Sequence, residues 1–247
     1  MSYTDFARYY DVLTDNVDYN DIAFYYSDIL QKYGSKTGKL LDLGCGTGNL
    51  TVRLERLGFS DITGCDLSQN MLDLAKEKSE NIKWLCCDMS KLPFENEFDT
   101  VIATLDSINH LKDEKAIEQA FEGVYKSLKN GGIFAADLNT PYKHQNILAD
   151  NVFTFDYEDE GLYCVWENQQ VPNDPLNRID MFLEFFELLE DGNYKRSSDS
   201  LSEIALSPEK ITEMLVKAGF KVLECSEYLT GEELEEASEK FTVIAKK

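Results

Sequence analysis

In residues 40–48, LLDLGCGTG, three glycines directly follow an apolar run, and a carboxylate stands inside that run. Because glycine lacks a Cβ atom, Gly44, Gly46 and Gly48 allow a sharp turn and let a ligand lie against the backbone. A loop that follows a strand and precedes a helix lies at the carboxyl edge of an open α/β sheet, where ligands bind. The spacing therefore predicts a cofactor site rather than a simple tight turn.

Two classes of cofactor use such a loop, and Asp42 separates them. Dinucleotide sites have the spacing G-x-G-x-x-G, with the pyrophosphate at a helix N-terminus. Here Asn49 stands where the last glycine is expected, and the Asp42 carboxylate would repel a pyrophosphate. S-adenosylmethionine has no phosphate and carries an ammonium and a sulfonium, so the acid and the spacing both predict this cofactor.

At this motif the chain resembles the class I S-adenosylmethionine-dependent methyltransferases, whose first motif is acid-x-Gly-x-Gly-x-Gly. Downstream, TGCDLS, WLCCDMS, FDTVIATLDSINHL and LKNGGIFAADLNTP resemble later motifs of the family in the same order, over about residues 39–140. The resemblance implies that the methionine end of the cofactor contacts Asp42, Gly44, Cys45, Gly46, Thr47 and Gly48. It implies that the ribose and the adenine of the cofactor contact Asp66, Leu67, Met71, Asp88 and Met89. Leu105, in the active-site lip, is implied as a further cofactor contact.

The acceptor side is less determined by the sequence. His110 follows the fourth predicted strand, where family members often approach the acceptor, so it is a candidate general base. A lone histidine is more often structural, and this alternative stays open. Asp106 and Asn109 share the same segment and could orient a polar substrate or cap the loop. The N-terminal DFARYYDVL resembles an aromatic lid, with Tyr10 or Tyr9 closing over the methyl donor.

Strands and helices alternate through the first part of the chain, which predicts a parallel sheet with helices on both faces. Residues 1–35 are expected to be helical. The expected strands are 39–43, 61–65, 82–86, 100–104 and 132–138, with helices at 49–57, 68–77 and 113–128. A helix at 208–218 and strands at 221–226 and 241–245 follow later. The fold class is a Rossmann-like, doubly wound, seven-stranded and mostly parallel sheet with the last strand reversed.

Between these parts, residues 152–206 have the pattern of antiparallel hairpins, with turn signals at Glu160-Gly161, 172–175 and 191–193. We expect a small antiparallel sheet inserted as a subdomain at 151–206, while 1–150 and 207–247 form the cofactor-binding domain with its helical lid. This arrangement resembles the sugar-amine N-methyltransferase branch. The inserted sheet would wall the substrate pocket or pair two subunits. Its aromatic residues are Phe153, Phe155, Tyr157, Trp166, Phe182, Phe185 and Phe186.

The composition limits the partners. A formal net charge of -22 opposes binding to DNA or to anionic membranes, and no run approaches a membrane span. NTPY at 139–142 has the wrong position for the amino-methyltransferases of DNA. The six cysteines form no C-x-x-C pair and the two histidines are far apart in the sequence, so we expect reduced thiols, no metal and a cytoplasmic protein.

The predicted function is methyl transfer from S-adenosylmethionine to a nitrogen or oxygen of a small molecule, by a monomer or homodimer. The alternatives are a methyltransferase that acts on protein or RNA, and a non-catalytic protein that binds S-adenosylmethionine. The acid at position 42 argues against a dehydrogenase.

Overall fold

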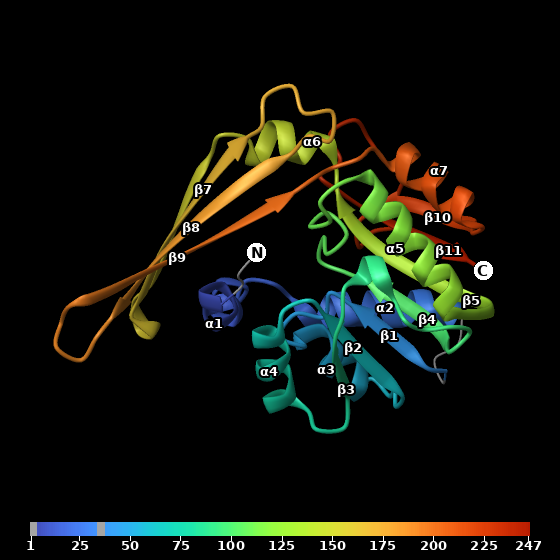
Figure 1. Ribbon diagram of the computed structural model, residues 1–247, viewed down its shortest axis with the longest axis horizontal. Helices are drawn as coiled ribbons and strands as arrows, with labels where there is room; N and C mark the ends of the chain where they lie inside the picture. The colour runs from blue at the N-terminus through green and yellow to red at the C-terminus, as the bar shows by residue number, and fades with distance from the viewer. Residues whose placement is uncertain (1–3, 34–37) are drawn as a thin grey trace.

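Seven strands form the larger of two sheets in the computed structural model, which describes residues 4–33 and 38–247 (Figure 1). Their spatial order is β10-β11-β5-β4-β1-β2-β3. The pairs among β1 to β5 are parallel, whereas β11 lies antiparallel between β5 and β10. The predicted seven-stranded sheet with a reversed last strand is therefore confirmed. The strands are β1 (Leu40–Leu43), β2 (Ile62–Asp66), β3 (Lys83–Cys86), β4 (Phe98–Ala103), β5 (Leu128–Asn139), β10 (Lys221–Glu227) and β11 (Lys240–Lys246).

Helices cover both faces of this sheet because the central strands are apolar on both sides. Leu40 and Ile102 pack with α2 and α3, whereas Leu41 and Val101 pack with α5 and α7, and all four side chains are buried. The helices around the sheet are α2 (Tyr19–Tyr33), α3 (Asn49–Arg56), α4 (Gln69–Lys78), α5 (Glu114–Ser127) and α7 (Pro208–Ala218). Among the described residues, no helix is both long and apolar enough to cross a membrane.

The predicted ends of α7 are confirmed in detail. The Ser207 hydroxyl accepts a hydrogen bond from the Lys210 N–H, Pro208 occupies the first turn, and Gly219 ends the helix with φ 108°. By contrast, β5 begins at Leu128, four residues earlier than predicted. A register irregularity against β4 and a positive φ at Gly131 let the strand continue through the glycine pair.

The second sheet has four antiparallel strands in the order β6-β7-β8-β9 and projects away from the first (Figure 1). It confirms the predicted inserted sheet, whereas the division of the chain into two domains stays a prediction. The segment before it contains short helices that the sequence analysis missed. The strands are β6 (Val152–Tyr157), β7 (Leu162–Gln170), β8 (Ile179–Leu188) and β9 (Tyr194–Glu203), and the short helices of the chain are η1 (Met89–Lys91), α6 (Pro141–Lys143), η2 (His144–Leu148) and η3 (Glu158–Glu160).

The N-terminal helix α1 (Thr4–Leu13) packs on the four-stranded sheet. The rings of Tyr9 and Phe185 lie 4.8 Å apart, and Phe6 meets Trp166 edge to face at 6.4 Å. The predicted helical region 1–35 is thus two helices, separated at residues 14–18, and its residues 1–3, 34 and 35 lie outside the described part. The inserted sheet therefore holds α1 in place through aromatic packing.

Cys65 and Cys87 form a disulfide, so the expectation that all six cysteines are reduced thiols is wrong for this pair. Cys65 lies near the end of β2 and Cys87 directly follows β3, and these strands are parallel neighbours. Their Cα atoms are 5.9 Å apart, within the range that a disulfide requires. The remaining cysteines, Cys45, Cys86, Cys164 and Cys225, are free.

The end of β5 is tied to α2 and to the segment after β4 through one buried carboxylate, Asp137. It accepts hydrogen bonds from the Tyr26 hydroxyl at 2.8 Å and from the Leu105 and Asp106 N–H groups at 3.0 and 3.1 Å. Leu105 and Asp106 both have positive φ, 52° and 55°, which costs free energy in non-glycine residues. Asp137 therefore stabilises a strained lip beside the first sheet.

We expect Tyr26→Phe to lower the free energy of unfolding by about 1.5–3 kcal/mol, because a buried carboxylate loses a charge-assisted hydrogen bond. Urea denaturation measures the change. Tyr33→Phe on the same helix is the matched control, since the Tyr33 hydroxyl bonds Glu224 near the surface. Equal small changes for both variants would contradict the role given to Asp137.

Candidate cofactor site

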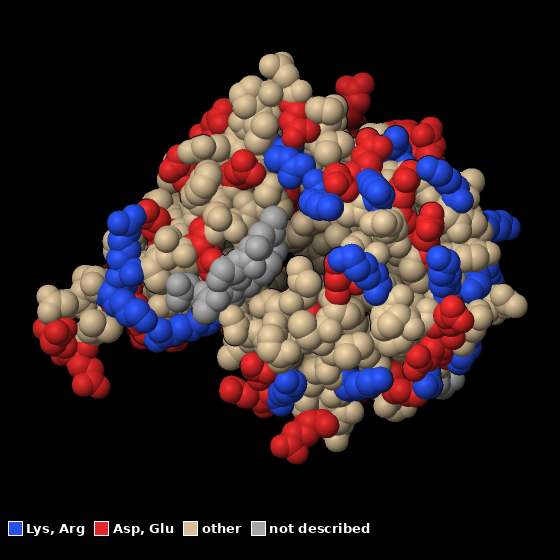
Figure 2. Space-filling model, viewed as in Figure 1, with Lys and Arg blue, Asp and Glu red and all other residues tan. Residues whose placement is uncertain are grey.

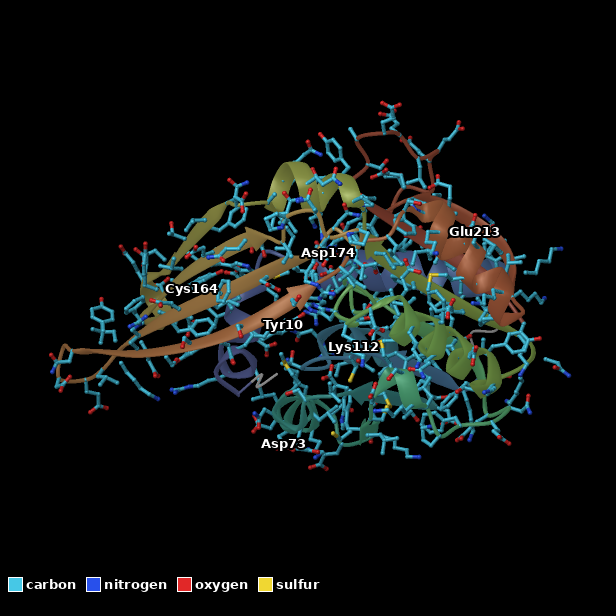
Figure 3. All side chains as sticks on the ribbon, turned by 45° about the horizontal axis from the view of Figure 1, so that its top comes forward. Tyr10, Asp73, Lys112, Cys164, Asp174 and Glu213 are labelled. Carbon is cyan, nitrogen blue, oxygen red and sulfur yellow. A yellow bond between two sulfur atoms is a disulfide. The ribbon has the colours of Figure 1, made fainter. Side chains whose placement is uncertain are left out.

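A cavity of about 170 Å³ lies at the carboxyl ends of β1, β2, β3 and β4 and is closed on one side by α1. Figure 3 shows Tyr10 between the four-stranded sheet, which carries Cys164, and the α/β layers. The sequence analysis missed several residues of the lining, among them Phe6, Tyr19 and Ser107. The predicted site residues that line the cavity are Tyr10, Asp42, Gly44, Cys45, Gly46, Thr47, Asp66, Leu67, Met71, Asp88, Met89, Leu105 and His110.

The glycine loop has a backbone that side chains would disturb. Gly44, Gly46 and Gly48 have φ values of 72°, 53° and 77°. A Cβ atom at Gly44 would lie 2.5 Å from the Ser107 Cβ, and one at Gly48 would lie 2.6 Å from the Trp84 ring. Gly48 does not line the cavity; it caps α3 and packs against Trp84 instead. At Gly46 the nearest atom would be 3.8 Å away, on Tyr10, so this glycine leaves space open beside the lid.

Asp42 is buried at the end of β1 with one carboxylate oxygen satisfied and one not. Its Oδ2 accepts a hydrogen bond of 2.7 Å from the Thr51 hydroxyl, whereas Oδ1 has no partner among the described residues. Burial raises the pKa of Asp42 to about 7; the Thr51 hydrogen bond opposes this and the charge of Asp66 adds to it. An unsatisfied buried carboxylate oxygen fits a ligand that brings a hydrogen-bond donor or a positive charge.

The affinity for S-adenosylhomocysteine, which carries an ammonium, should therefore depend on pH. Below about pH 7 Asp42 binds a proton in the free protein, and the proton must be lost before the carboxylate pairs with the ligand. We expect the affinity to fall by up to about tenfold per pH unit below pH 7 and to level off above about pH 8. Calorimetric titration across this range measures the effect. A constant affinity would contradict a direct pairing of Asp42 with the ligand.

Asp66 is the last residue of β2 and Asp88 lies two residues after β3, and their carboxylates differ in environment. Asp66 accepts hydrogen bonds from the Gly46 N–H at 2.9 Å and the Ser68 N–H at 2.8 Å, and burial raises its pKa. Asp88 accepts from the Ser90 N–H at 2.9 Å and pairs with the exposed Lys91. Burial would raise the pKa of Asp88, but its hydrogen bonds to Ser90 and Lys91 lower it. Asp66 thus ties the glycine loop to β2, whereas Asp88 caps η1.

The lid helix α1 is fastened to the glycine loop by Asp11. Its Oδ1 accepts hydrogen bonds from the Thr47 hydroxyl at 2.6 Å and the Asn49 amide at 2.9 Å, and Oδ2 pairs with Lys78 at 2.6 Å. These contacts place Tyr10 over Gly46. Burial, with Tyr19 next, raises the pKa of Tyr10 well above its usual value, so its phenol stays protonated. Tyr10 can close the cavity and donate a hydrogen bond, but it is not a base near neutral pH.

Tyr9 is not part of the cavity lining. Its hydroxyl donates to Glu187 at 3.1 Å and its ring packs on the inserted sheet. Of the two tyrosines that the sequence left open, the structure therefore places Tyr10 at the site.

Of the two roles left open for Asn109, orienting a substrate and capping the loop, its contacts support the second. Its amide is buried and fully used: Nδ2 donates to the carbonyl oxygens of Asn139 and Ile204 at 3.2 and 2.8 Å, and Oδ1 accepts from the Asn139 N–H. Asp106, for which the same two roles were open, pairs with Lys240 at 2.5 Å and does not line the cavity. Both residues hold the lip in place.

His110 lines the cavity, and its environment includes a residue that sequence reasoning missed. The His110 Nε2 lies 3.5 Å from Oε1 of Glu203, the last residue of β9. Oxygen and nitrogen atoms of Asp106, His110 and Glu203 all lie within 4.8 Å of one another, so the three groups could hold a cation. The Lys240 ammonium already pairs with Asp106 there. The sequence did carry a signal for Glu203: it is the one charged residue in 200–207, SLSEIALS, where the other residues are apolar or small.

Comparison with known proteins identifies the class to which this fold and site belong. Residues 40–132 match the methyltransferase domain family. The chain is 34% identical over 252 residues to a provisionally named methyltransferase of Geobacillus sp. (strain WCH70), with 100% of both chains covered. The chain belongs to this family and is an S-adenosylmethionine-dependent methyltransferase.

Solved structures agree with this assignment. An S-adenosylmethionine-dependent methyltransferase from Clostridium acetobutylicum ATCC 824 superposes with a TM-score of 0.86 and 29% identity, covering 99% of this chain and 98% of that chain. The sugar N-methyltransferase KedS8 from Streptoalloteichus sp ATCC 53650 has a TM-score of 0.77 at 19% identity, covering 96% and 93%. The second likeness shows the shared fold alone.

Proposed function

We propose that the methyl acceptor is a small molecule, methylated on a nitrogen or an oxygen atom. The observation that carries the proposal is the covered cavity: α1 closes it, and Asp11 fixes α1 to the glycine loop through Thr47 and Asn49 and to α4 through Lys78. An acceptor must enter this small space beside the donor, which a metabolite does more easily than a folded macromolecule. KedS8, named for N-methylation of a sugar, has the same fold and is compatible with this proposal.

We further propose which residues hold the cofactor. The unsatisfied Asp42 oxygen and the open space at Gly46 fit the charged methionine end, and Asp66 lies where ribose hydroxyls would need an acceptor. When bound, S-adenosylmethionine supplies a methyl group on a positively charged sulfur, which is an activated donor. The complete proposed set is Tyr10, Asp42, Gly44, Cys45, Gly46, Thr47, Asp66, Leu67, Met71, Asp88, Met89 and Leu105, while Gly48 shapes the loop without lining the cavity.

The protein then needs to align the acceptor and to receive its proton. We propose His110 as the group that accepts this proton, because its ring lines the cavity and a buried nitrogen of it has no partner among the described residues. Tyr10 covers the donor and excludes water, and Phe6 and Tyr19 add aromatic surface. Alignment in such a space supplies much of the rate of an in-line displacement.

The charge of the molecule argues against a nucleic-acid acceptor. The formal net charge is -22, and on the face in Figure 2 the Lys and Arg side chains are interspersed with Asp and Glu. A phosphate backbone is attracted by clustered basic groups and repelled by an excess of acidic ones.

The proposal is tested with S-adenosylmethionine that carries a labelled methyl group. We expect label to enter one class of small molecule in a panel of amino sugars, amines, phenols and hydroquinones. Asp42→Asn is the binding-deficient control. Transfer of label only to tRNA or to protein, with none to the panel or to a low-molecular-weight cell extract, would contradict the proposal.

A further inference from the structure

Two histidines, the half-buried His110 and the buried His144, contact Glu203 outside the cofactor contacts described above. Glu203 is 5% exposed; its Oε1 lies 3.5 Å from His110 Nε2 and its Oε2 lies 3.3 Å from His144 Nε2. The Asn139 amide also donates to Oε2 at 3.0 Å. The three elements that meet here are the segment after β4, the π-helix η2 and the end of β9 in the inserted sheet. π-Helical turns are frequent at functional sites.

The surroundings of His144 favour a proton on its Nε2, which lies 3.3 Å from Glu203 Oε2 and has no hydrogen-bond partner among the described residues. His144 Nδ1 lies 2.7 Å from the Asn177 carbonyl oxygen, which can only accept, so Nδ1 carries a proton. If Nε2 were unprotonated, its lone pair would be close to a carboxylate oxygen in a buried position without a compensating hydrogen bond, which is unfavourable. The proton therefore belongs on His144 Nε2.

The same reasoning fixes the orientation of His110. With an ionised Glu203 beside it, Nε2 is the ring nitrogen that carries the proton, and the lone pair is on Nδ1. His110 Nδ1 is buried and has no hydrogen-bond partner among the described residues, while the ring lines the cavity. At 3.5 Å the contact with Glu203 is longer than a good hydrogen bond, and catalytic hydrogen bonds commonly shorten in the substrate complex.

We propose that Glu203 is a positioning residue, which holds His110 with its Nδ1 lone pair toward the acceptor, and that His144 holds Glu203 in turn. The inference rests on the proposed role of His110. As the acceptor atom bonds to the methyl carbon, the carbon–sulfur bond breaks and its electron pair stays on sulfur. The acceptor's proton goes to His110 Nδ1, and the imidazolium that forms is stabilised by Glu203 through Nε2–H. The inserted sheet thus contributes one carboxylate to the reaction centre.

Two lysines, Lys143 and Lys240, and the carboxylate of Asp106 lie near Glu203 and the two histidines. Asp106 pairs with Lys240 at 2.5 Å. The Lys143 ammonium donates a hydrogen bond of 3.0 Å to Oδ1 of the Asn139 side chain. Both lysines are directed at other partners, so Glu203 remains available to the two histidines.

Nuclear magnetic resonance tests the proposal directly because the chain has only 2 histidines. The protein is labelled at both ring nitrogens of histidine and examined just above neutral pH. We expect His144 with protons on both nitrogens and His110 with its proton on Nε2 alone. In Glu203→Gln we expect His144 to lose its Nε2 proton. Glu184→Gln on the exposed part of the same sheet is the matched control and should leave both rings unchanged.

A His110 proton on Nδ1, or identical His144 protonation in the wild type and Glu203→Gln, would overturn the proposal. Glu203→Asp serves if the glutamine variant does not fold, since the shorter side chain withdraws from both rings and should release the same proton.

With an acceptor from the labelled-methyl panel, Glu203→Gln should lower kcat by about 10–100-fold and leave the KM for S-adenosylmethionine within about twofold. An unchanged kcat would also overturn it. The ring protonation is measured without an acceptor, so a failed acceptor search leaves this test intact.

Discussion

Asp42→Asn is expected to weaken the binding of S-adenosylhomocysteine by about 100-fold or more and, at the same time, to stabilise the ligand-free protein. The loss of affinity follows because the variant removes the charge opposite the ligand ammonium, and losing one partner of a buried charged pair costs about 2–5 kcal/mol. The gain in stability follows because the wild type buries a carboxylate with an unsatisfied oxygen.

The size of the stability change depends on pH. The pKa of Asp42 is raised to about 7 in the folded protein, so the folded state binds a proton more tightly than the unfolded state. The contribution of Asp42 to the stability therefore declines as pH rises from about 4 and is level above about 7, where the penalty is roughly 4 kcal/mol at most. We expect Asp42→Asn to be about 2–4 kcal/mol more stable than the wild type near pH 8 and the difference to shrink near pH 5.

Urea denaturation and calorimetry on the same samples measure both effects. Asp73→Asn is the control, because Asp73 is exposed on α4 and pairs only with surface groups. A variant that binds S-adenosylhomocysteine as the wild type does, or that is less stable at every pH, would show that Asp42 has been given the wrong role. Opposite signs for binding and stability are typical of residues placed for function.

Gly44→Ala is expected to lower the free energy of unfolding by about 3 kcal/mol and to lower the affinity for S-adenosylhomocysteine by about 100-fold. The added Cβ meets two penalties: a positive φ of 72°, worth about 1 kcal/mol, and a contact of 2.5 Å with the Ser107 Cβ. Relief of this contact must shift Ser107 or the loop, and either shift changes the cavity that both line.

Two other glycines separate these penalties. Gly192 has a φ of 82° but open space around its Cβ position, so Gly192→Ala should cost only about 1 kcal/mol and leave the affinity unchanged. Gly46→Ala should fold, since the nearest atom is 3.8 Å away, yet should lose affinity because its methyl group enters the cavity. Equal stability losses for Gly44→Ala and Gly192→Ala would contradict the close approach at Ser107.

The order of the elements and the glycine loop could be predicted because their signals are local. An apolar run followed by glycines, a serine and proline at a helix start, and turn residues between hairpins each act within a few positions. Asp42 was informative for the same reason: a carboxylate inside a buried strand has a high cost, and the structure shows its second oxygen unsatisfied.

The acceptor side could not be predicted because it is assembled from distant parts of the chain. Glu203 reaches His110 from another sheet, and His144 reaches Glu203 from a π-helix that no sequence signal marked. The choice between Tyr9 and Tyr10 depended on which side of α1 meets the inserted sheet. Likewise, the disulfide between Cys65 and Cys87 depends on the alignment of β2 with β3.

Calorimetric titration of the wild-type protein with S-adenosylhomocysteine just above neutral pH tests the central claim most directly, namely that the glycine loop and Asp42 form a site for this adenosyl ligand. We predict one binding site per chain, with an affinity that falls as the pH is lowered through about 7. Folded protein that gives no binding heat with S-adenosylhomocysteine or S-adenosylmethionine, but binds a nicotinamide dinucleotide, would contradict the account.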